Sequence, residues 1–195
     1  RRWAKDAGPL ARATGEPLQD LSYTYDIAGN IVAIRDATLP EMYHDNQRVR
    51  PESTYEYDPL YRLIRASGRE QAARTGAPGP ATGGLPDSPD PGHGALRCYV
   101  QTYKFDDHGN LERMRHIAKG GKWTRQYRYQ PGANRLRKSW IGGAANEPVN
   151  DNFAHDAHGS MVVMEDLPGL AWDFADRLKS IDPGTGREAW YVYDG

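Results

Sequence analysis

The chain has 195 residues, of which only 38% are hydrophobic, and it is rich in Gly (21), Pro (14) and Tyr (12). This composition is typical of many short strands joined by turns rather than of a helical globule. The 25 basic and 26 acidic residues are interspersed and leave a net charge of −1, which argues against partners such as nucleic acid or an anionic membrane.

Residues 1–20 contain several Gly and Pro residues and are predicted to form an irregular N-terminal lead-in. The first residues include no hydrophobic stretch of signal-peptide type, and no apolar run approaches the roughly 18 residues of a membrane span. The chain starts without Met and stops inside an unfinished motif, so we expect a fragment of a longer protein. Any export determinants are then expected to lie outside this segment.

A short motif recurs along the rest of the chain and predicts its architecture. Its clearest copy is residues 23–31, Tyr-Thr-Tyr-Asp-Ile-Ala-Gly-Asn-Ile, and two other copies carry Arg where this one has Asn. The copies span 23–31, 55–63, 103–111, 127–136, 153–161 and 172–178, and 191–194 begins a seventh. Their anchor residues are Asp26, Asp58, Asp106, Gln130, Asp156, Asp173 and Asp194, at irregular intervals of 32, 48, 24, 26, 17 and 21 residues.

The residue types of one copy predict a β-hairpin. Aromatic residues at positions i and i+2 lie on one face of a strand and give that face a large apolar area. The Asp accepts a hydrogen bond from a backbone N–H two residues on, and the Gly after it takes the left-handed conformation of a type I turn with a bulge. Adjacent hairpins are expected to bury each other's aromatic faces, with cross-strand pairs contributing about 0.2 to 1 kcal/mol each.

Two copies depart from this pattern, because Tyr61 and Asp176 stand where the best copies have Gly. A bulky residue in the left-handed conformation costs about 1 kcal/mol or more. Asp tolerates that conformation and Tyr tolerates it poorly, so the turn at Tyr61 is expected to differ in shape.

Two segments between the copies are predicted to be loops. Residues 71–95 hold five Pro and six Gly, and they are expected to form a flexible insert that enlarges one hairpin connection, with a ligand-binding role as the less favoured alternative. The polar residues 37–51 are expected to form a loop with a partial strand. The predicted fold is all-β: consecutive antiparallel hairpins over residues 21–195 that form a curved, strip-like sheet.

Several residues resemble parts of reactive sites, and each has a simpler interpretation. The lone Cys98 is interpreted as a small strand residue, and His155 and His158 as turn residues, because a structural zinc site needs four ligands. Ser160 and Ser180 lack a nucleophile elbow, and the pairs Gly83-Gly84, Gly120-Gly121 and Gly142-Gly143 lack the end of a phosphate loop. Residues 87–90 have too few oxygen donors for calcium. We therefore assign no catalytic, cofactor-binding or metal-binding residue and expect no enzymatic activity.

The motif in its two forms, Tyr-x-Tyr-Asp-x-x-Gly-Asn-Ile/Leu and Tyr-x-Tyr-Asp-x-x-x-Arg-Leu, resembles the YD repeats of bacterial Rhs proteins. Residues 57–70, and Trp172-Asp173 leading to 190–194, are similar to the Rhs segment of the insecticidal toxin-complex C subunit and related polymorphic toxins. The resemblance covers about residues 21–195. It implies a wall segment of a hollow cocoon of β-sheet that encloses a C-terminal toxic domain.

The resemblance does not extend to a protease site. The Rhs family ends its shell with an aspartyl autoprotease core, and Asp182-Pro183-Gly184 is superficially similar to the Asp-Pro-x-Gly of that core. The following residues, 185–190, depart from the expected continuation. No protease aspartate is therefore placed in this chain, and the core and the toxin are expected downstream.

Two functions follow as hypotheses. The first is a structural shell segment of a secreted toxin-complex protein, with neighbouring repeats, an encapsulated C-terminal toxin domain and a toxin-complex subunit as partners. The alternative is an extracellular module that recognises carbohydrate or a cell-surface partner. A downstream core and a variable terminal domain would favour the shell, whereas glycan binding by this segment alone would favour the module. Exposed sheet edges predict that the isolated segment dimerises or aggregates.

Overall fold

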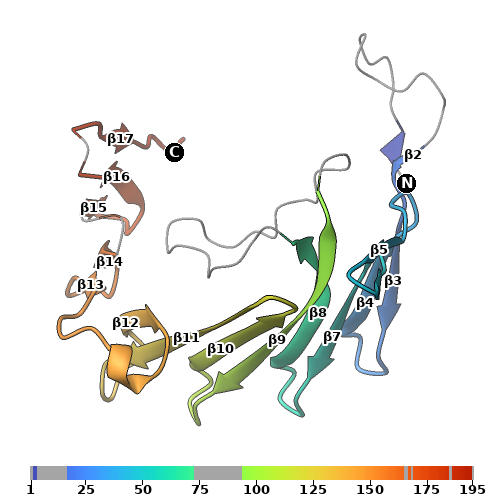
Figure 1. Cartoon of the computed structure of the whole chain (residues 1–195). Coiled ribbons are helices and arrows are strands. Elements are labelled where there is room, and N and C mark those ends of the chain that lie inside the picture. Colours follow the sequence, from blue (N-terminus) through green and yellow to red (C-terminus); the bar gives the residue numbers. More distant parts are fainter. Residues whose placement is uncertain are drawn as a thin grey trace. The chain divides into compact units, whose positions relative to one another are not determined.

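A computed structural model describes residues 2–3, 17–72, 94–164, 167, 169–184 and 186–194. Nearly all regular structure in these residues is β-strand (Figure 1), and the one helical element among them is the short 3-10 helix η2 (Ala144–Asn146). The predicted all-β fold is therefore confirmed. In the part of the chain that the structure describes, no helix is long and apolar enough to cross a membrane.

The strands form one large sheet and four small ones. They are β1 (Arg2–Trp3), β2 (Pro17–Gln19), β3 (Leu21–Tyr25), β4 (Ile31–Asp36), β5 (Met42–His44), β6 (Gln47–Val49), β7 (Glu52–Tyr57), β8 (Leu63–Gln71), β9 (Leu96–Phe105), β10 (Leu111–Ala118), β11 (Gly121–Tyr129), β12 (Leu136–Ile141), β13 (Ala154–His155), β14 (Met161–Val163), β15 (Gly169–Trp172), β16 (Leu178–Asp182) and β17 (Ala189–Trp190). The large sheet has the order β12-β11-β10-β9-β8-β7-β4-β3, and the small sheets are β1-β2, β5-β6, β13-β14 and β15-β16-β17.

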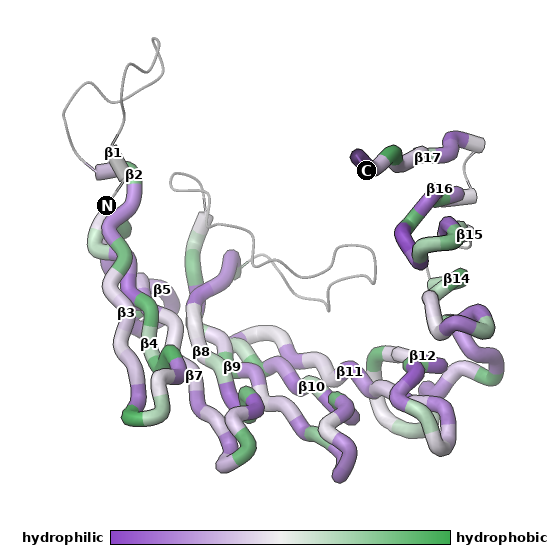
Figure 2. The backbone as a smooth tube through the Cα atoms, turned by 180° about the vertical axis from the view of Figure 1, so that it is seen from behind, coloured by the Kyte–Doolittle hydropathy of each residue, from purple (hydrophilic) through white to green (hydrophobic). Residues whose placement is uncertain are grey.

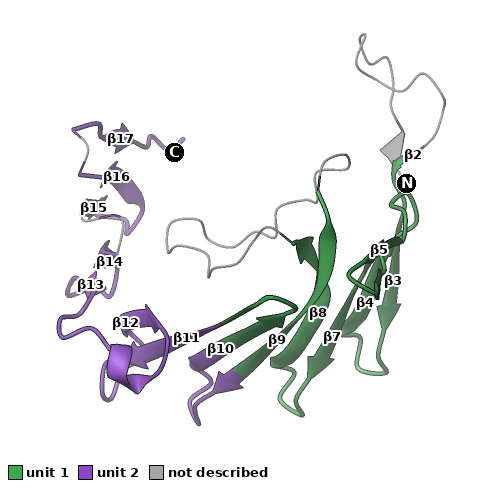
Figure 3. Ribbon diagram, in the orientation of Figure 1, with its two compact units in different colours: residues 1–76, 86–103, 115–122 green, residues 77–85, 104–114, 123–195 purple. Residues whose placement is uncertain are grey.

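The chain divides into two compact units (Figure 3). Unit 1 consists of residues 1–76, 86–103 and 115–122, and unit 2 of residues 77–85, 104–114 and 123–195. Unit 1 therefore holds the first two copies of the motif, and the later copies have their turns in unit 2.

Every complete copy of the motif lies at the turn between two neighbouring strands, as the sequence predicts. The hairpins are β3-β4, β7-β8, β9-β10, β11-β12, β13-β14 and β15-β16. In the first of them Thr24 and Tyr25 pair with Ala33 and Ile31, which leaves Val32 as an extra residue in the returning strand. The same register shift occurs in the hairpins of β7, β11, β13 and β15, so the predicted bulge recurs along the chain.

The predictions for the insert and for residues 37–51 differ in their agreement with the structure. Strands β8 and β9 pair antiparallel up to Gln71 and Leu96, so the insert enlarges one hairpin connection, as predicted; residues 73–93 themselves lie outside the described residues. Residues 37–51 were predicted to hold a partial strand, but they form a complete hairpin, β5-β6. Its turn residues Asp45 and Asn46 have φ of 52° and 59°, the left-handed conformations of a type I′ turn that short polar side chains tolerate.

The N-terminal lead-in contains one small sheet. In it β1 pairs antiparallel with β2, where Arg2 is opposite Gln19. Residues 1 and 4–16 of the predicted irregular segment lie outside the described residues. The lead-in was predicted to be irregular, but it contains these two paired strands.

The apolar core is small, as expected from the low hydrophobic content. Its buried residues among those described are Val49, Ala66, Leu96, Trp140 and Phe153. Figure 2 shows that hydrophobic stretches are short and interspersed with hydrophilic ones along the strands.

The aromatic pairs are less buried than the sequence predicts. Tyr23 and Tyr25 stack with ring centroids 6.5 Å apart, yet they stay 46% and 57% exposed. Their strand β3 is the end strand of the large sheet, so it has a neighbouring strand on one side alone. The corresponding rings of the next copy, Tyr55 and Tyr57, have neighbours on both sides and are half-buried.

Candidate functional site: the repeated turn and the links between hairpins

The anchor Asp organises each turn by accepting several backbone hydrogen bonds. Asp26 Oδ1 accepts from the backbone N–H of Ala28 at 2.9 Å and of Asn30 at 2.8 Å. The turn is closed by backbone bonds between Asp26 and Asn30 and between Gly29 and Asp26. The predicted bond to the residue two positions on is therefore confirmed, and it recurs at Asp58, Asp106 and Asp173.

The second carboxylate oxygen is bound by the side chain four residues after the Asp. Asn30 Nδ2 donates to Asp26 Oδ2 at 2.8 Å, and Arg62 Nε donates to Asp58 Oδ2 at 2.7 Å. The same bonds are made to Asp106 by Asn110 and to Asp173 by Arg177. The two forms of the motif, with Asn or with Arg, thus supply the same N–H donor to the same oxygen.

These donors lower the pKa values of the anchor carboxyl groups. The side-chain hydrogen bond from Asn30 is the main reason that the pKa of Asp26 lies below its ordinary value, and Asn110 has the same effect on the pKa of Asp106. For Asp173 the backbone N–H of Arg177 contributes most to the lowered pKa. All three anchors are stabilised as carboxylates, since each bond is made to the charged form.

The turn at Tyr61 keeps the shape of the other turns, contrary to the prediction. Tyr61 has φ of 61° and Asp176 has φ of 55°, where Gly29 has 91°. The N–H of Tyr61 still donates to the carbonyl of Asp58 at 2.9 Å. The Asp58 hydrogen bonds, including the one from Arg62, hold the backbone in place and offset the strain of a left-handed Tyr.

A second repeated contact links each hairpin to the one before it. The aromatic residue immediately before the anchor donates a hydrogen bond to the backbone carbonyl of the first strand residue after the preceding turn. The four bonds are Tyr57 Oη to Ile31 O at 2.9 Å, Tyr129 Oη to Leu111 O at 3.1 Å, Trp172 Nε1 to Met161 O at 2.8 Å, and Tyr193 Oη to Leu178 O at 2.8 Å. Every copy after the first that has Tyr or Trp at this position makes the link.

The copy anchored by Gln130 differs in its electrostatics. It keeps the turn, with Gly132 at φ of 74° and Ala133 N–H donating to Gln130 O, but Gln cannot offer a carboxylate. Arg135, which stands at the position of Arg62 and Arg177, lies instead beside the next turn. A Cβ added to Gly159 would come within 3.1 Å of its guanidinium.

Unit 1 contains a buried polar cluster that joins strands β8, β9 and β10. Glu70 Oε1 accepts from Arg97 Nε at 2.8 Å and lies 3.3 Å from His116 Nε2. Arg97 also donates to the Lys119 carbonyl at 2.8 Å, and the Tyr99 ring stacks on His116 with centroids 5.2 Å apart. Burial raises the pKa of Glu70, but the hydrogen bonds from His116 and Arg97 outweigh it and leave that pKa lowered.

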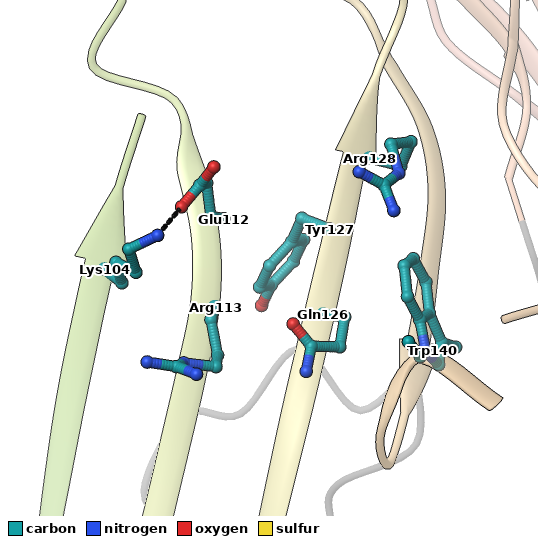
Figure 4. Close-up of a pocket in the computed structure, with 8 residues that line it drawn as sticks. Lys104, Glu112, Arg113, Gln126, Tyr127, Arg128 and Trp140 are labelled. Carbon is teal, nitrogen blue, oxygen red and sulfur yellow. Dashed lines mark hydrogen bonds and ion pairs between the residues drawn. The ribbon is translucent and has the colours of Figure 1, made fainter. Parts of the chain in front are cut away.

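Unit 2 has a cavity of about 180 Å³ on the sheet (Figure 4). It is lined by Lys104, Glu112, Arg113, Gln126, Tyr127, Arg128, Trp140 and Ala144. A larger open groove of about 650 Å³ lies between the turns anchored by Asp106 and Gln130. Glu112, Tyr127 and Arg128 line both.

The described residues that resemble parts of reactive sites in the sequence do not form such a site. Cys98 is exposed, with its Sγ 3.7 Å from the Arg48 carbonyl. His158 pairs with Asp176 of the next turn at 3.2 Å, and Asp156 accepts from the N–H groups of Gly159 and Ser160. Gly83-Gly84 and residues 87–90 lie outside the described residues.

Two further candidates have structural positions. Ser180 is buried in the middle of β16, and Asp182 accepts a 2.8 Å hydrogen bond from the N–H of Gly184 within a turn. Across the described ranges, no group of three or more His, Cys, Asp or Glu residues is placed to hold a metal ion.

Comparison with known proteins supports the resemblance seen in the sequence. No known family profile matches the chain. It is 31% identical over 183 residues to toxin subunit YenC2 and 32% identical over 186 residues to toxin subunit YenC1, both of Yersinia entomophaga. These matches cover 91% and 93% of this chain and 18% of each relative, so the chain spans about a fifth of their length.

A solved structure has the same fold. The structure titled Photorhabdus luminescens Tc holotoxin pore, with the mutation TccC3-D651A, matches with a TM-score of 0.60 and 27% sequence identity. The match covers 93% of this chain and 8% of the matched chain. The chain therefore resembles, over more than nine tenths of its length, a segment of these toxin subunits and of the matched holotoxin chain, in agreement with the resemblance to YD repeats seen in its sequence.

Proposed function

We propose that this chain is a shell segment of a toxin-complex Rhs protein, in which its hairpins form part of a wall that encloses a C-terminal toxic domain. The observation that carries the proposal is the similarity to two toxin subunits over more than nine tenths of the chain. The likeness to a chain of a Tc holotoxin structure supports the same function. Carbohydrate recognition, the alternative, has no comparable support.

The repeated contacts are suited to such a wall. Each turn is held by its own anchor, and each linking Tyr or Trp bonds to the hairpin before it, so hairpins can be added in series without a large apolar core. A wall of this kind gains stability from nearest-neighbour contacts. The partners that we propose are neighbouring repeats, the enclosed toxic domain and another toxin-complex subunit, in a protein that acts outside the producing cell.

We also propose that the segment itself is not catalytic. Its anchor Asp residues are used for turns, where each is bound by backbone and side-chain donors. A general acid or base needs a pKa near the working pH, and the pKa values of Asp26, Asp58, Asp106 and Asp173 are shifted downward. Toxicity would then belong to the enclosed domain.

Limited proteolysis of the full-length natural protein tests the shell. The terminal toxic domain should resist protease while the wall is intact and should be cleaved when the wall is weakened by Arg97→Met, which removes one partner of the buried pair with Glu70. Arg115→Gln, a change at an exposed position of β10, serves as the matched control. Cleavage of the terminal domain that is equally rapid in the natural protein and in both variants would show that this domain is not enclosed.

A further inference from the structure

One junction inside the large sheet lacks the bond that links a hairpin to the one before it. The link position of the third copy is Phe105, whose ring has no donor group. This junction is the pairing of β8 with β9, and the sheet is continuous across it. The connection between the two strands is also the one that the insert enlarges. Because a long connection adds to the entropy that pairing must overcome, the β8-β9 junction needs another support.

The β5-β6 hairpin leaves the large sheet and returns to it at one point. The N–H of Asp36 donates to the carbonyl of Pro51 at 3.1 Å, and β4 pairs directly with β7. Residues 37–50 are therefore an excursion that adds no strand to the large sheet. Residues 40–49, which contain the hairpin, are called the strap below.

The strap is bound to strands that are not its neighbours in sequence. Side chains from β8, from β9 and from the residue that follows β10 contact its backbone carbonyls, and all of these residues belong to unit 1. Lys119 also pairs with the carboxylate of Asp45 at 2.5 Å. The three contacts to carbonyls are Arg69 Nη1 to Pro40 O at 3.2 Å, Cys98 Sγ to Arg48 O at 3.7 Å, and Lys119 Nζ to Asp45 O at 3.0 Å.

The strap lies on the face of the sheet opposite the buried polar cluster. Arg69 is paired with Cys98, and the next pair along the two strands is Glu70 with Arg97. Successive residues of a strand point to opposite faces, so the strap and the Glu70–Arg97 pair are on different sides. Val49 of the strap is 0% exposed, which shows that the strap is packed. The end of the β8-β9 junction next to the insert is therefore held from both faces.

We propose that the strap holds the β8-β9 junction together in place of the missing Tyr link. Its contacts to Arg69 and Cys98 lie two residues from the end of the pairing, Gln71 with Leu96, where the insert departs. A tether at this end opposes fraying of the two strands. The inference goes beyond the wall function, since it holds whether or not the wall encloses a toxic domain.

Hydrogen exchange of the 195-residue chain, followed by mass spectrometry, tests the proposal. The variant Val49→Ala, Lys119→Gln removes the buried side chain and the ion pair of the strap. Amides of β8 and β9 should then exchange about tenfold faster, because local opening becomes easier, while those of β3 and β4 should be unchanged. Adding Phe105→Tyr to this variant supplies a hydroxyl at the link position and should slow exchange again by about fivefold, the factor for one hydrogen bond.

Tyr43→Ala, Lys122→Gln is the matched control. Tyr43 is 76% exposed on the same hairpin, and Lys122 is an exposed residue of β11. These changes should leave exchange in β8 and β9 within about twofold. Unchanged exchange of β8 and β9 in the strap variant would overturn the proposal, as would equal acceleration in β3 and β4, which would indicate general destabilisation. Failure of Phe105→Tyr to slow exchange would show that the strap does not replace a link.

Discussion

The hydroxyl of Tyr57 donates a 2.9 Å hydrogen bond to the carbonyl of Ile31, the first residue of the strand that follows the preceding turn. Ile31 stands five residues after Asp26, and Tyr57 stands one residue before Asp58. The same two positions are joined in Tyr129 and Leu111, although the two residues come from other copies. The Tyr of the motif therefore connects hairpins, whereas the Asp shapes the turn within one hairpin.

Tyr57→Phe should lower the free energy of unfolding by about 1 kcal/mol, because it leaves the Ile31 carbonyl without this donor while keeping the ring. The measurement is urea unfolding followed by circular dichroism. Tyr61→Phe is the control, since Tyr61 is 64% exposed and should tolerate the loss of its hydroxyl. If the two variants unfold at the same urea concentration, the Tyr57 bond contributes nothing.

Substitutions at the left-handed turn position should have opposite effects. Gly109→Ala should destabilise the chain by about 1 kcal/mol, because Gly109 has φ of 86° and a Cβ there meets no other atom within 4 Å, so the effect is conformational alone. Tyr61→Gly should stabilise it by up to about 1 kcal/mol, since the strain of a left-handed Tyr is removed. Thermal unfolding shows whether each variant is more or less stable than the unchanged chain. A Tyr61→Gly variant that melts at a lower temperature would contradict this account of the turn.

Stability should decline in acid because the anchor carboxylates have lowered pKa values. The unfolded-state pKa of Asp is about 3.9, and the folded-state pKa values of Asp26 and Asp106 are lower. Their contribution is therefore fully present above that pH and is lost as the pH falls through the folded values. Urea midpoints measured between neutral pH and strong acid should decline below about pH 4, and the decline should be smaller in the double variant Asp26→Asn, Asp106→Asn. An unchanged pH dependence in that variant would show that other groups cause it.

Removing one partner of the buried Glu70–Arg97 pair should cost more stability than removing both partners. Arg97→Met should cost about 3 kcal/mol, because it leaves the Glu70 carboxylate buried with His116 as its remaining partner. The double variant Glu70→Leu, Arg97→Met should recover most of that loss, since no unpaired charge remains. Urea unfolding of the two single variants and the double variant completes the cycle. Additive effects would mean that the two side chains do not interact.

Local features of the fold could be predicted from the sequence. The position of each hairpin, the left-handed residue and the bulge follow from neighbouring residues, because a turn is set by a few side chains such as Asp26 and Gly29. The β5-β6 hairpin was missed in part, since its turn residues Asp45 and Asn46 follow a strand of only three residues, Met42–His44, which is too short to show aromatic residues at alternate positions.

Contacts between distant residues could not be predicted in the same way. Tyr57 and Ile31 are 26 residues apart, and Glu70 and His116 are 46 apart, so no local pattern joins them. The role of Asn30 and Arg62 could have been predicted from the two forms of the motif. Both side chains stand four residues after the anchor, and both can donate an N–H to its carboxylate. No local pattern predicts the cavity beside Arg113, because its lining comes from four separate stretches of the chain.

The links between hairpins are tested most directly by removing several at once. The triple variant Tyr57→Phe, Tyr129→Phe, Tyr193→Phe loses three of the four bonds, and a matched variant, Tyr43→Phe, Tyr61→Phe, changes two exposed Tyr residues. Urea unfolding should show a loss of about 3 kcal/mol in the triple variant and almost none in the matched one, since distant bonds contribute additively. Equal stability of the two variants would contradict a wall of hairpins joined by their Tyr residues.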